Sequence, residues 1–283
     1  MQELSVGAAR ITVINLGDLK FALKEVIATP EETWRPRYGD LFERRLSFPS
    51  QSILVSIGGT LILVDAGEYW KFAEEGSEYV EKGYQPPPGL ASQLKAMNVG
   101  AEQVGHVVIT HAHYDHFAGV TTSKGKDLVL TFPHAHHYLG TADWEWPELQ
   151  KAMADASSNE AKTLGKLDQA GALKLVATET ELIRGVSILP TPGESPGHQI
   201  LRVKSEGQTA YCVGDLFHSS VEVENPSWMA SWCDPEVNLR SRRNFIDSAI
   251  GERAVVIPAH MPPGHIMRSE TGAKYEELTE QER

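Results

Sequence analysis

Short apolar runs separated by turn-forming residues recur along most of this chain, and this pattern predicts many short strands. The clearest example is a hairpin in which residues 52–57 and 60–65 flank the pair Gly58-Gly59. Two apolar runs joined by two glycines are typical of a tight β-turn. The same pattern predicts further strands at residues 10–15, 106–110, 128–131, 173–176, 186–189, 199–203, 209–213 and 254–257.

Helical spacing of apolar residues is confined to a few segments. It predicts helices at residues 90–97, 144–153, 160–169 and 235–250. Short strands in hairpins, interrupted by a few helices, predict two sheets packed face to face with helices outside them. We therefore expect an α+β fold in a single domain that spans residues 1–283.

Two stretches of the chain, residues 18–50 and 67–89, are polar and irregular in pattern, and we expect them to be loops. Both are rich in aromatic residues, and so is the segment around 228–232. These side chains either wall a pocket for a small, partly apolar substrate or anchor their loops on the outer faces of the sheets. The aromatic residues concerned are Trp34, Phe48, Tyr69, Trp70, Tyr84, Trp228 and Trp232.

The composition excludes some classes of partner. The chain has 283 residues and a formal net charge of -12, which argues against a nucleic-acid partner because the phosphate backbone would be repelled. A signal peptide and a membrane-spanning run are not recognisable in the sequence. The 2 cysteines, Cys212 and Cys233, suit a reducing compartment, so the cytoplasm is expected. The oligomeric state stays open, a homodimer included.

The strongest chemical signal directly follows the predicted strand 106–110. His111, His113, Asp115 and His116 place four potential metal ligands within six residues. A turn that leaves a strand can aim alternate side chains into one pocket, so His111 and His113 can share a cation while Asp115 and His116 face a second one. Imidazole and carboxylate groups suit Zn²⁺, with Mn, Fe and Co as alternatives.

One turn cannot complete two coordination shells, so more ligands must come from other segments. Three candidates stand beside predicted strands: His198 before residues 199–203, Asp215 after 209–213, and His260 after 254–257. A lone histidine or aspartate in such a place is usually a turn or surface residue. The cluster at 111–116 changes that interpretation, because its cations need additional ligands. One carboxylate, Asp215, can bridge two cations about 3.5–4 Å apart.

In this order the residues resemble the metallo-β-lactamase superfamily, whose signature reads H-x-H-x-D-H followed by a distant His, Asp and His. The resemblance extends from about Ile11 to His260 and includes the hairpin that ends in Asp65. It implies an αββα sandwich of two packed mixed sheets with helices outside, and a site for two divalent metal ions. The implied ligands are His111, His113, Asp115, His116, His198, Asp215 and His260.

Further motifs narrow the resemblance to one branch. Residues 189–198, 214–218 and 259–265 look like those of N-acyl homoserine lactonases and methyl parathion hydrolase. True class B β-lactamases lack an aspartate that matches Asp215. His218 stands at the position where many lactonases have tyrosine. The parathion-hydrolase-like members have histidine there, as this chain does. The implied enzyme cleaves a lactone, ester or phosphotriester by attack of a hydroxide shared between the metals.

The resemblance also implies catalytic roles for two residues. Asp115 is expected to return a proton to the leaving oxygen. His218 is expected either to donate a hydrogen bond to the oxygen that gains charge or only to pack beside the metal ligands. A second histidine-rich run at His134, His136 and His137 is predicted to be structural or to lie at the rim. His265 is expected in a loop near the site.

Two alternatives remain at this stage. A thioesterase resembling glyoxalase II shares the seven-ligand pattern. A non-catalytic metal-bound sensing module is the other, although structural zinc sites normally close with four ligands. Tests of lactones, aryl esters, thioesters and phosphotriesters on the metal-loaded protein discriminate between them.

Overall fold

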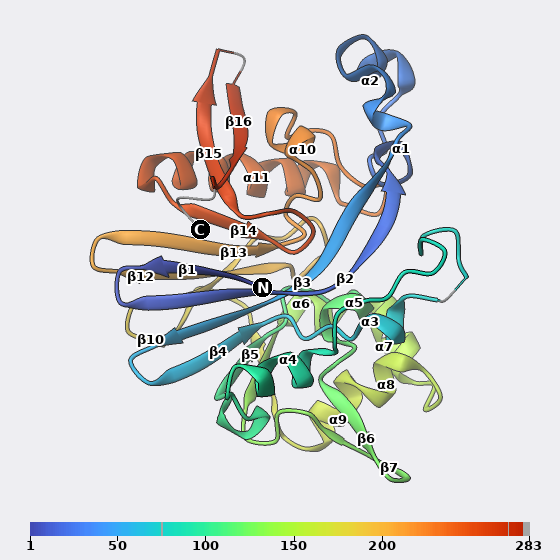
Figure 1. Ribbon diagram of the computed structural model, residues 1–283, viewed down its shortest axis with the longest axis vertical. Helices are drawn as coiled ribbons and strands as arrows, with labels where there is room; N and C mark the ends of the chain where they lie inside the picture. The colour runs from blue at the N-terminus through green and yellow to red at the C-terminus, as the bar shows by residue number, and fades with distance from the viewer. Residues whose placement is uncertain (75, 271, 280–283) are drawn as a thin grey trace.

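Two seven-stranded sheets form the centre of the molecule, and each occupies one half of the chain (Figure 1). The computed structural model describes residues 1–74, 76–270 and 272–279. In spatial order the first sheet contains β1 (Gln2–Val6), β2 (Ala9–Ala22), β3 (Arg45–Ile57), β4 (Thr60–Val64), β5 (His106–Val108), β8 (His136–Gly140) and β9 (Leu173–Val176). The second contains β10 (Thr180–Ile183), β11 (Val186–Pro190), β12 (Gln199–Ser205), β13 (Gln208–Gly214), β14 (Val255–Pro258), β15 (Gly264–Ser269) and β16 (Gly272–Glu277).

Both sheets are mixed. In the first, β4, β5, β8 and β9 run parallel to one another, and the remaining pairs are antiparallel. In the second, β13 and β14 are the parallel pair. A separate hairpin is formed by β6 (Thr121–Lys124) and β7 (Asp127–Leu130).

Helices are short except for one. The helices of the first half are α1 (Leu23–Val26), α2 (Glu31–Tyr38), α3 (Tyr69–Phe72), α4 (Leu90–Ala96), α5 (Tyr114–Phe117), α6 (Thr141–Trp144), α7 (Pro147–Met153), α8 (Asn159–Lys162) and α9 (Leu164–Gln169), with 3-10 turns at Gly39–Phe42 and Ala101–Gln103. The second half contributes α10 (Ser220–Glu224) and α11 (Pro235–Glu252). Within the described residues, no helix has the length and apolar character needed to span a membrane.

Alternation of side chains along the strands explains the layered fold. Ile53, Val55, Ile62 and Val64 point between the sheets, where they pack with residues of the second sheet such as Leu201. Neighbouring positions point outward, because successive side chains of a strand face opposite sides. Apolar residues at both sets of positions therefore require cover on both faces of each sheet.

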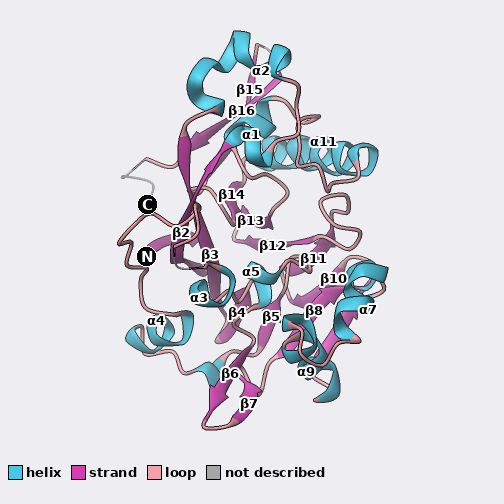
Figure 2. Ribbon diagram, turned by 90° about the vertical axis from the view of Figure 1, so that its right-hand side faces the viewer, coloured by secondary structure: helices cyan, strands magenta, loops and turns pink. Residues whose placement is uncertain are grey.

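Helices provide that cover. Leu54 and Leu63 on the outer face of the first sheet pack with Leu94 of α4 and Phe117 of α5. On the outer face of the second sheet, Val213 and Tyr211 belong to a cluster that includes residues of α11, the long helix seen in Figure 2. The arrangement is an αββα sandwich, and the predicted fold class is confirmed.

The expected loop at residues 18–50 is the main error of the sequence prediction. β2 continues to Ala22 and β3 begins at Arg45, so the two strands form a ribbon that extends from the sandwich and carries α1 and α2 at its tip (Figure 1). The ribbon begins at a bulge, where Asn15 pairs with Gln51 and Gly17 with Ser50, which leaves Leu16 unpaired. Gly17 has φ +152°, and a Cβ there would overlap the Tyr69 ring.

Other predicted elements differ only in detail. The predicted helix 144–153 begins later, as α7, because Pro147 occupies the first helical position, and Trp144 ends the preceding helix α6. The predicted helix 160–169 is likewise two short helices that meet at Thr163. The stretch 67–89 contains the short helix α3 and is otherwise irregular in its described residues, as expected.

Candidate metal centre

The ligand-rich segment leaves β5 at the end of the sandwich, and Asp65 fixes its start. Asp65 follows β4, the parallel neighbour of β5. Its carboxylate accepts hydrogen bonds from the Thr110 backbone NH at 2.8 Å and from the Thr110 hydroxyl at 2.9 Å. The same carboxylate lies 2.8 Å from Nδ1 of His116. This contact orients the ring so that Nε2 is turned toward Asp115 and Asp215, each 3.4 Å away.

A second buried carboxylate, Asp143, joins two loops that carry predicted ligands. It accepts hydrogen bonds from the Ala112 NH at 2.8 Å, the Ser195 hydroxyl at 2.9 Å and the Gly197 NH at 2.6 Å. The first donor belongs to the loop of His111 and His113, and the other two belong to the loop before His198. Asp143 thus fixes the relative position of these loops.

Asp215 lies at the centre of the cluster. Its Oδ2 is 3.4 Å from His116 Nε2, 3.7 Å from His111 Nε2 and 3.3 Å from His218 Nε2, and its Oδ1 is 3.2 Å from His260 Nε2. Gly214 before it has φ +52°, and a Cβ there would lie 2.7 Å from Thr110, so the turn requires glycine. Burial opposes ionisation, but His260, His116 and His218 hold the pKa of Asp215 well below its ordinary value.

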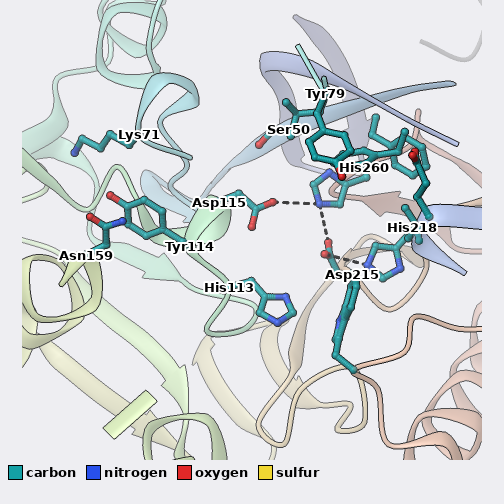
Figure 3. Close-up of a pocket in the computed structure, with 16 residues that line it drawn as sticks. Ser50, Lys71, Tyr79, His113, Tyr114, Asp115, Asn159, Asp215, His218 and His260 are labelled. Carbon is teal, nitrogen blue, oxygen red and sulfur yellow. Dashed lines mark ion pairs between the residues drawn. The ribbon is translucent and has the colours of Figure 1, made fainter. Parts of the chain in front are cut away.

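Side-chain atoms that can ligate a metal form two groups. His111, His113 and Asp215 belong to one group together with Glu194; Asp115, His116 and His260 form the other. Six of the seven predicted ligands are therefore brought together. Figure 3 shows Asp115, His260, Asp215 and His218 in succession across the site.

His198, the seventh predicted ligand, lies outside both groups. Its ring is fully buried, with its centroid 5.3 Å from that of His111. Nδ1 is 2.9 Å from the Thr191 hydroxyl, and Nε2 has no hydrogen-bond partner. Burial lowers the pKa of His198 to about 3, so its imidazole is neutral, as metal ligation requires. Burial likewise lowers the pKa of His111 well below its ordinary value.

Glu194 was missed by the sequence analysis. Its buried carboxylate lies 3.4 Å from His111 and 3.3 Å from His113. In the sequence it is an acidic residue in a turn between two Pro and Gly pairs, which is an ordinary surface pattern. The signal that could have found it is its place four residues before His198 in a loop already predicted to carry a ligand.

His218 lines the centre with a carboxylate near each ring nitrogen. Nε2 is 3.3 Å from Asp215 and Nδ1 is 3.5 Å from Glu222, whose other oxygen pairs with Arg242 at 2.7 Å. Although burial opposes protonation, Glu222 and Asp215 raise the pKa of His218 to about 10. The two carboxylates therefore favour the protonated form of the ring.

A cavity of about 630 Å³ opens onto the centre. Asp115, Asp215, His218 and His260 form part of its lining (Figure 3). Another part of the lining is apolar and comes from the β2–β3 ribbon and α1, namely Leu19, Phe21, Val26 and Phe48. The ribbon that was expected to be a loop is therefore a wall of the pocket.

The aromatic residues predicted to wall the pocket divide into two sets. Phe48 and Trp232 line it. Trp34 instead stacks on Phe42 and Trp228 contacts Phe42 edge-on, so both stabilise the tip of the ribbon. Tyr69 and Tyr84 hydrogen-bond to Asp18 outside the cavity lining, and Trp70 is exposed.

The remaining histidines lie away from the centre. His134 and His136 are exposed, and His137 is buried in β8. His265 lies in β15, and its Nδ1 donates to the Ala254 carbonyl at 2.9 Å. The expectation that His265 occupies a loop beside the site is wrong, because the chain turns back into an antiparallel strand at Gly264.

Comparison with known proteins agrees with the fold. A family model described as the metallo-beta-lactamase superfamily matches residues 46–268. The chain belongs to this superfamily. A curated relative, an N-acyl homoserine lactonase from Bacillus sp., is 23% identical over 188 residues, which span 65% of each protein, just under two thirds of the relative's length.

Solved structures of this superfamily superpose over nearly the whole chain. Hydrolase AbOPH gives a TM-score of 0.77 at 20% identity, covering 98% of this chain and 97% of the other. AidC, described as a dizinc quorum-quenching lactonase, gives a TM-score of 0.76 at 20% identity with the same coverage. At identities this low, the superpositions establish a common fold and nothing further.

Proposed function

We propose that this chain is a metal-dependent hydrolase that cleaves an ester-type bond, a lactone, carboxylic ester or phosphotriester, in a small and partly apolar substrate. The observation that carries the proposal is a pair of ligand groups at the base of a cavity with one apolar wall. The relatives described as lactonases support the same class of reaction.

The residues of the centre fit two divalent cations. Several buried atoms there lack hydrogen-bond partners, among them His116 Nε2, Glu194 Oε2, His198 Nε2 and Asp215 Oδ1. Unpaired polar atoms are costly to bury. Within the described residues, the ion-pair partners of Asp215 are four histidines. Imidazole nitrogens and carboxylate oxygens facing one another form a donor set suited to zinc or a similar ion.

We propose that the first position is held by His111, His113 and His198, the second by Asp115, His116 and His260, and that Asp215 serves both. When bound, two such cations supply Lewis acidity, which activates water and polarises the substrate. Asp65 holds His116 in the required tautomer through Nδ1, and the Pro49 carbonyl does the same for His260 at 2.8 Å.

Two residues move or hold protons in this proposal. Asp115 is partly exposed to the cavity, so its carboxylate can accept a proton and return it to the leaving oxygen. His218, fixed between Glu222 and Asp215, presents a ring N–H at the cavity wall and stabilises the substrate oxygen that gains charge. The apolar wall holds the rest of the substrate and excludes water.

One experiment tests the proposal as a whole. Protein purified without chelator is analysed for metals and then assayed against a lactone, an aryl ester, a thioester and a phosphotriester. We expect close to two divalent ions per chain and hydrolysis of at least one oxygen ester that chelator abolishes. One ion or none after supplementation contradicts the two-metal site. Hydrolysis of the thioester alone would assign a different activity to the same centre.

We also propose a small-molecule substrate, a cytoplasmic location and no nucleic-acid partner. The two buried free thiols, Cys212 and Cys233, support a reducing compartment. The net charge of -12 argues against nucleic acid.

A further inference from the structure

Glu194 is buried in the candidate metal centre, and its hydrogen bonds are too few to explain why a carboxylate is buried there. It lies in the loop between β11 and β12, and its side chain is fully buried. Its Oε1 accepts a hydrogen bond from Trp232 Nε1 at 2.7 Å and lies 3.3 Å from His113 Nδ1. Its Oε2 lies 3.4 Å from His111 Nε2 and has no hydrogen-bond partner.

The contrast with Asp143 shows what Glu194 lacks. Both are buried acids beside the same loop, but Asp143 accepts three hydrogen bonds that hold two loops together. Those hydrogen bonds offset the cost of burying the Asp143 carboxylate. Glu194 accepts one bond from an indole and otherwise faces imidazole nitrogens. A buried carboxylate is expensive unless it is paired or coordinates a metal.

Distances point to coordination. A four- or five-coordinate cation with ligands at about 2.0–2.2 Å places neighbouring ligands about 2.8–3.8 Å apart. Glu194 lies 3.4 Å from His111 and 3.3 Å from His113, and His111 lies 2.8 Å from His113 and 3.7 Å from Asp215. All four residues belong to one compact group of ligand atoms.

We propose that Glu194 is a protein ligand of the cation at His111 and His113. The inference rests on the metal site of the proposed function. It adds a charged oxygen donor to a position otherwise dominated by imidazole, which moves the preference of that position toward harder cations such as Mn²⁺.

The test uses metal binding alone, without substrate. Wild type and Glu194→Gln are stripped of metal and titrated with Zn²⁺ against a chromogenic chelator. Glutamine keeps the size of the side chain and an acceptor for Trp232, but it loses the charge. We expect one of the two Zn²⁺ affinities to fall at least tenfold, since even residues that only support a ligand are worth about 10–100-fold. The other affinity should change less.

Two control variants separate ligation from loop placement and from net charge. Trp232→Phe removes the hydrogen bond to Glu194 but leaves the carboxylate in place, and Glu3→Gln removes one charge from an exposed position on β1. Glu3→Gln should bind Zn²⁺ within about threefold of wild type. Trp232→Phe removes only a group that supports the carboxylate, so it should lose less affinity than Glu194→Gln does. If Trp232→Phe weakens binding as much as Glu194→Gln does, Glu194 only positions the loop and the proposal fails.

A spectroscopic readout covers the case in which Glu194→Gln is unstable. The visible absorption of bound Co²⁺ depends on its direct ligands, so Glu194→Asp, which keeps the charge on a shorter side chain, should shift the bands of one site. Unchanged Co²⁺ bands together with unchanged Zn²⁺ affinity in both Glu194 variants overturn the proposal. Absence of tight metal binding in wild type contradicts the proposed function itself.

Discussion

Asp215 lies between the two ligand groups, and its two carboxylate oxygens face different histidines. Oδ1 faces His260, while Oδ2 faces His111 and His116. A group in this place affects both of the proposed metal positions at once, whereas an exposed histidine such as His134 affects neither.

Replacement of Asp215 should therefore be far more harmful than replacement of an exposed histidine. We expect Asp215→Ala to lower kcat/KM at least a hundredfold and to reduce the bound metal, while His134→Ala stays within about twofold of wild type. Metal analysis and steady-state kinetics at equal folded fraction measure both. Comparable losses in the two variants would mean that the centre is wrongly assigned.

The second prediction at this scale concerns His218. If its N–H stabilises charge on the substrate, His218→Phe removes a contact made mainly in the transition state. The loss should appear in kcat, on the order of ten- to a thousandfold, with metal content unchanged. His218→Tyr supplies another donor and should recover part of kcat, more for a lactone than for a phosphotriester. Full kcat in the Phe variant on both substrates would reduce His218 to a packing role.

Sequence and structure agree best where ligand residues are close in the chain. The segment 111–116 can be recognised as a candidate metal site from the sequence, because four potential ligands fall within one turn. Glu194 and Asp143 carry no such signal, since their role depends on loops that meet only after folding. His198 was found through its neighbours, yet in the structure its ring lies outside both ligand groups.

The β2–β3 ribbon shows the same limit for secondary structure. Leu19 and Phe21 alternate with polar residues, as do Leu46 and Phe48, so the signal of a strand was present. Pro49 obscured it, because proline is rare within sheets. It is tolerated here because the ladder with β4 covers only Ile53–Ile57, so Pro49 pairs with β2 alone.

The ribbon has a consequence for specificity. Phe21 lines the cavity and contacts Phe48 edge-on at 5.5 Å. We expect Phe21→Ala to raise KM about tenfold for an ester with a long apolar arm, because apolar contact is lost. The KM for the shortest homologue should change less than twofold. Steady-state kinetics on a chain-length series measures this, and equal effects on short and long substrates would exclude the ribbon from substrate binding.

The stability of the folded molecule at acid pH depends on buried histidines, because burial disfavours their protonated form. His137 is fully buried in β8, and burial lowers its pKa to about 4 from an ordinary value of 6.5. Above pH 6.5 it is neutral in both the folded and the unfolded chain. Below that pH the unfolded chain takes up the proton first, so stability falls until the folded form is also protonated near pH 4.

His137→Leu should remove this part of the pH dependence. Between pH 7 and pH 5, wild type should lose about 2 kcal/mol more unfolding free energy than the variant does. Urea denaturation with chelator present in both samples measures the difference without the metal. The same slope in both proteins would show that His137 does not titrate in this range.

The division of the chain between the two sheets has a further consequence for the lifetime of the folded state. β9 ends at Val176 and β10 begins at Thr180, so each sheet is one continuous half of the chain. His111 and His116 belong to the first half, Asp215 and His260 to the second, and both cysteines are free. A cation bound as proposed, with ligands from both halves, would take the place of a covalent cross-link. Separation of the halves would then break metal–ligand bonds first, so we expect metal to slow unfolding in addition to shifting the folding equilibrium.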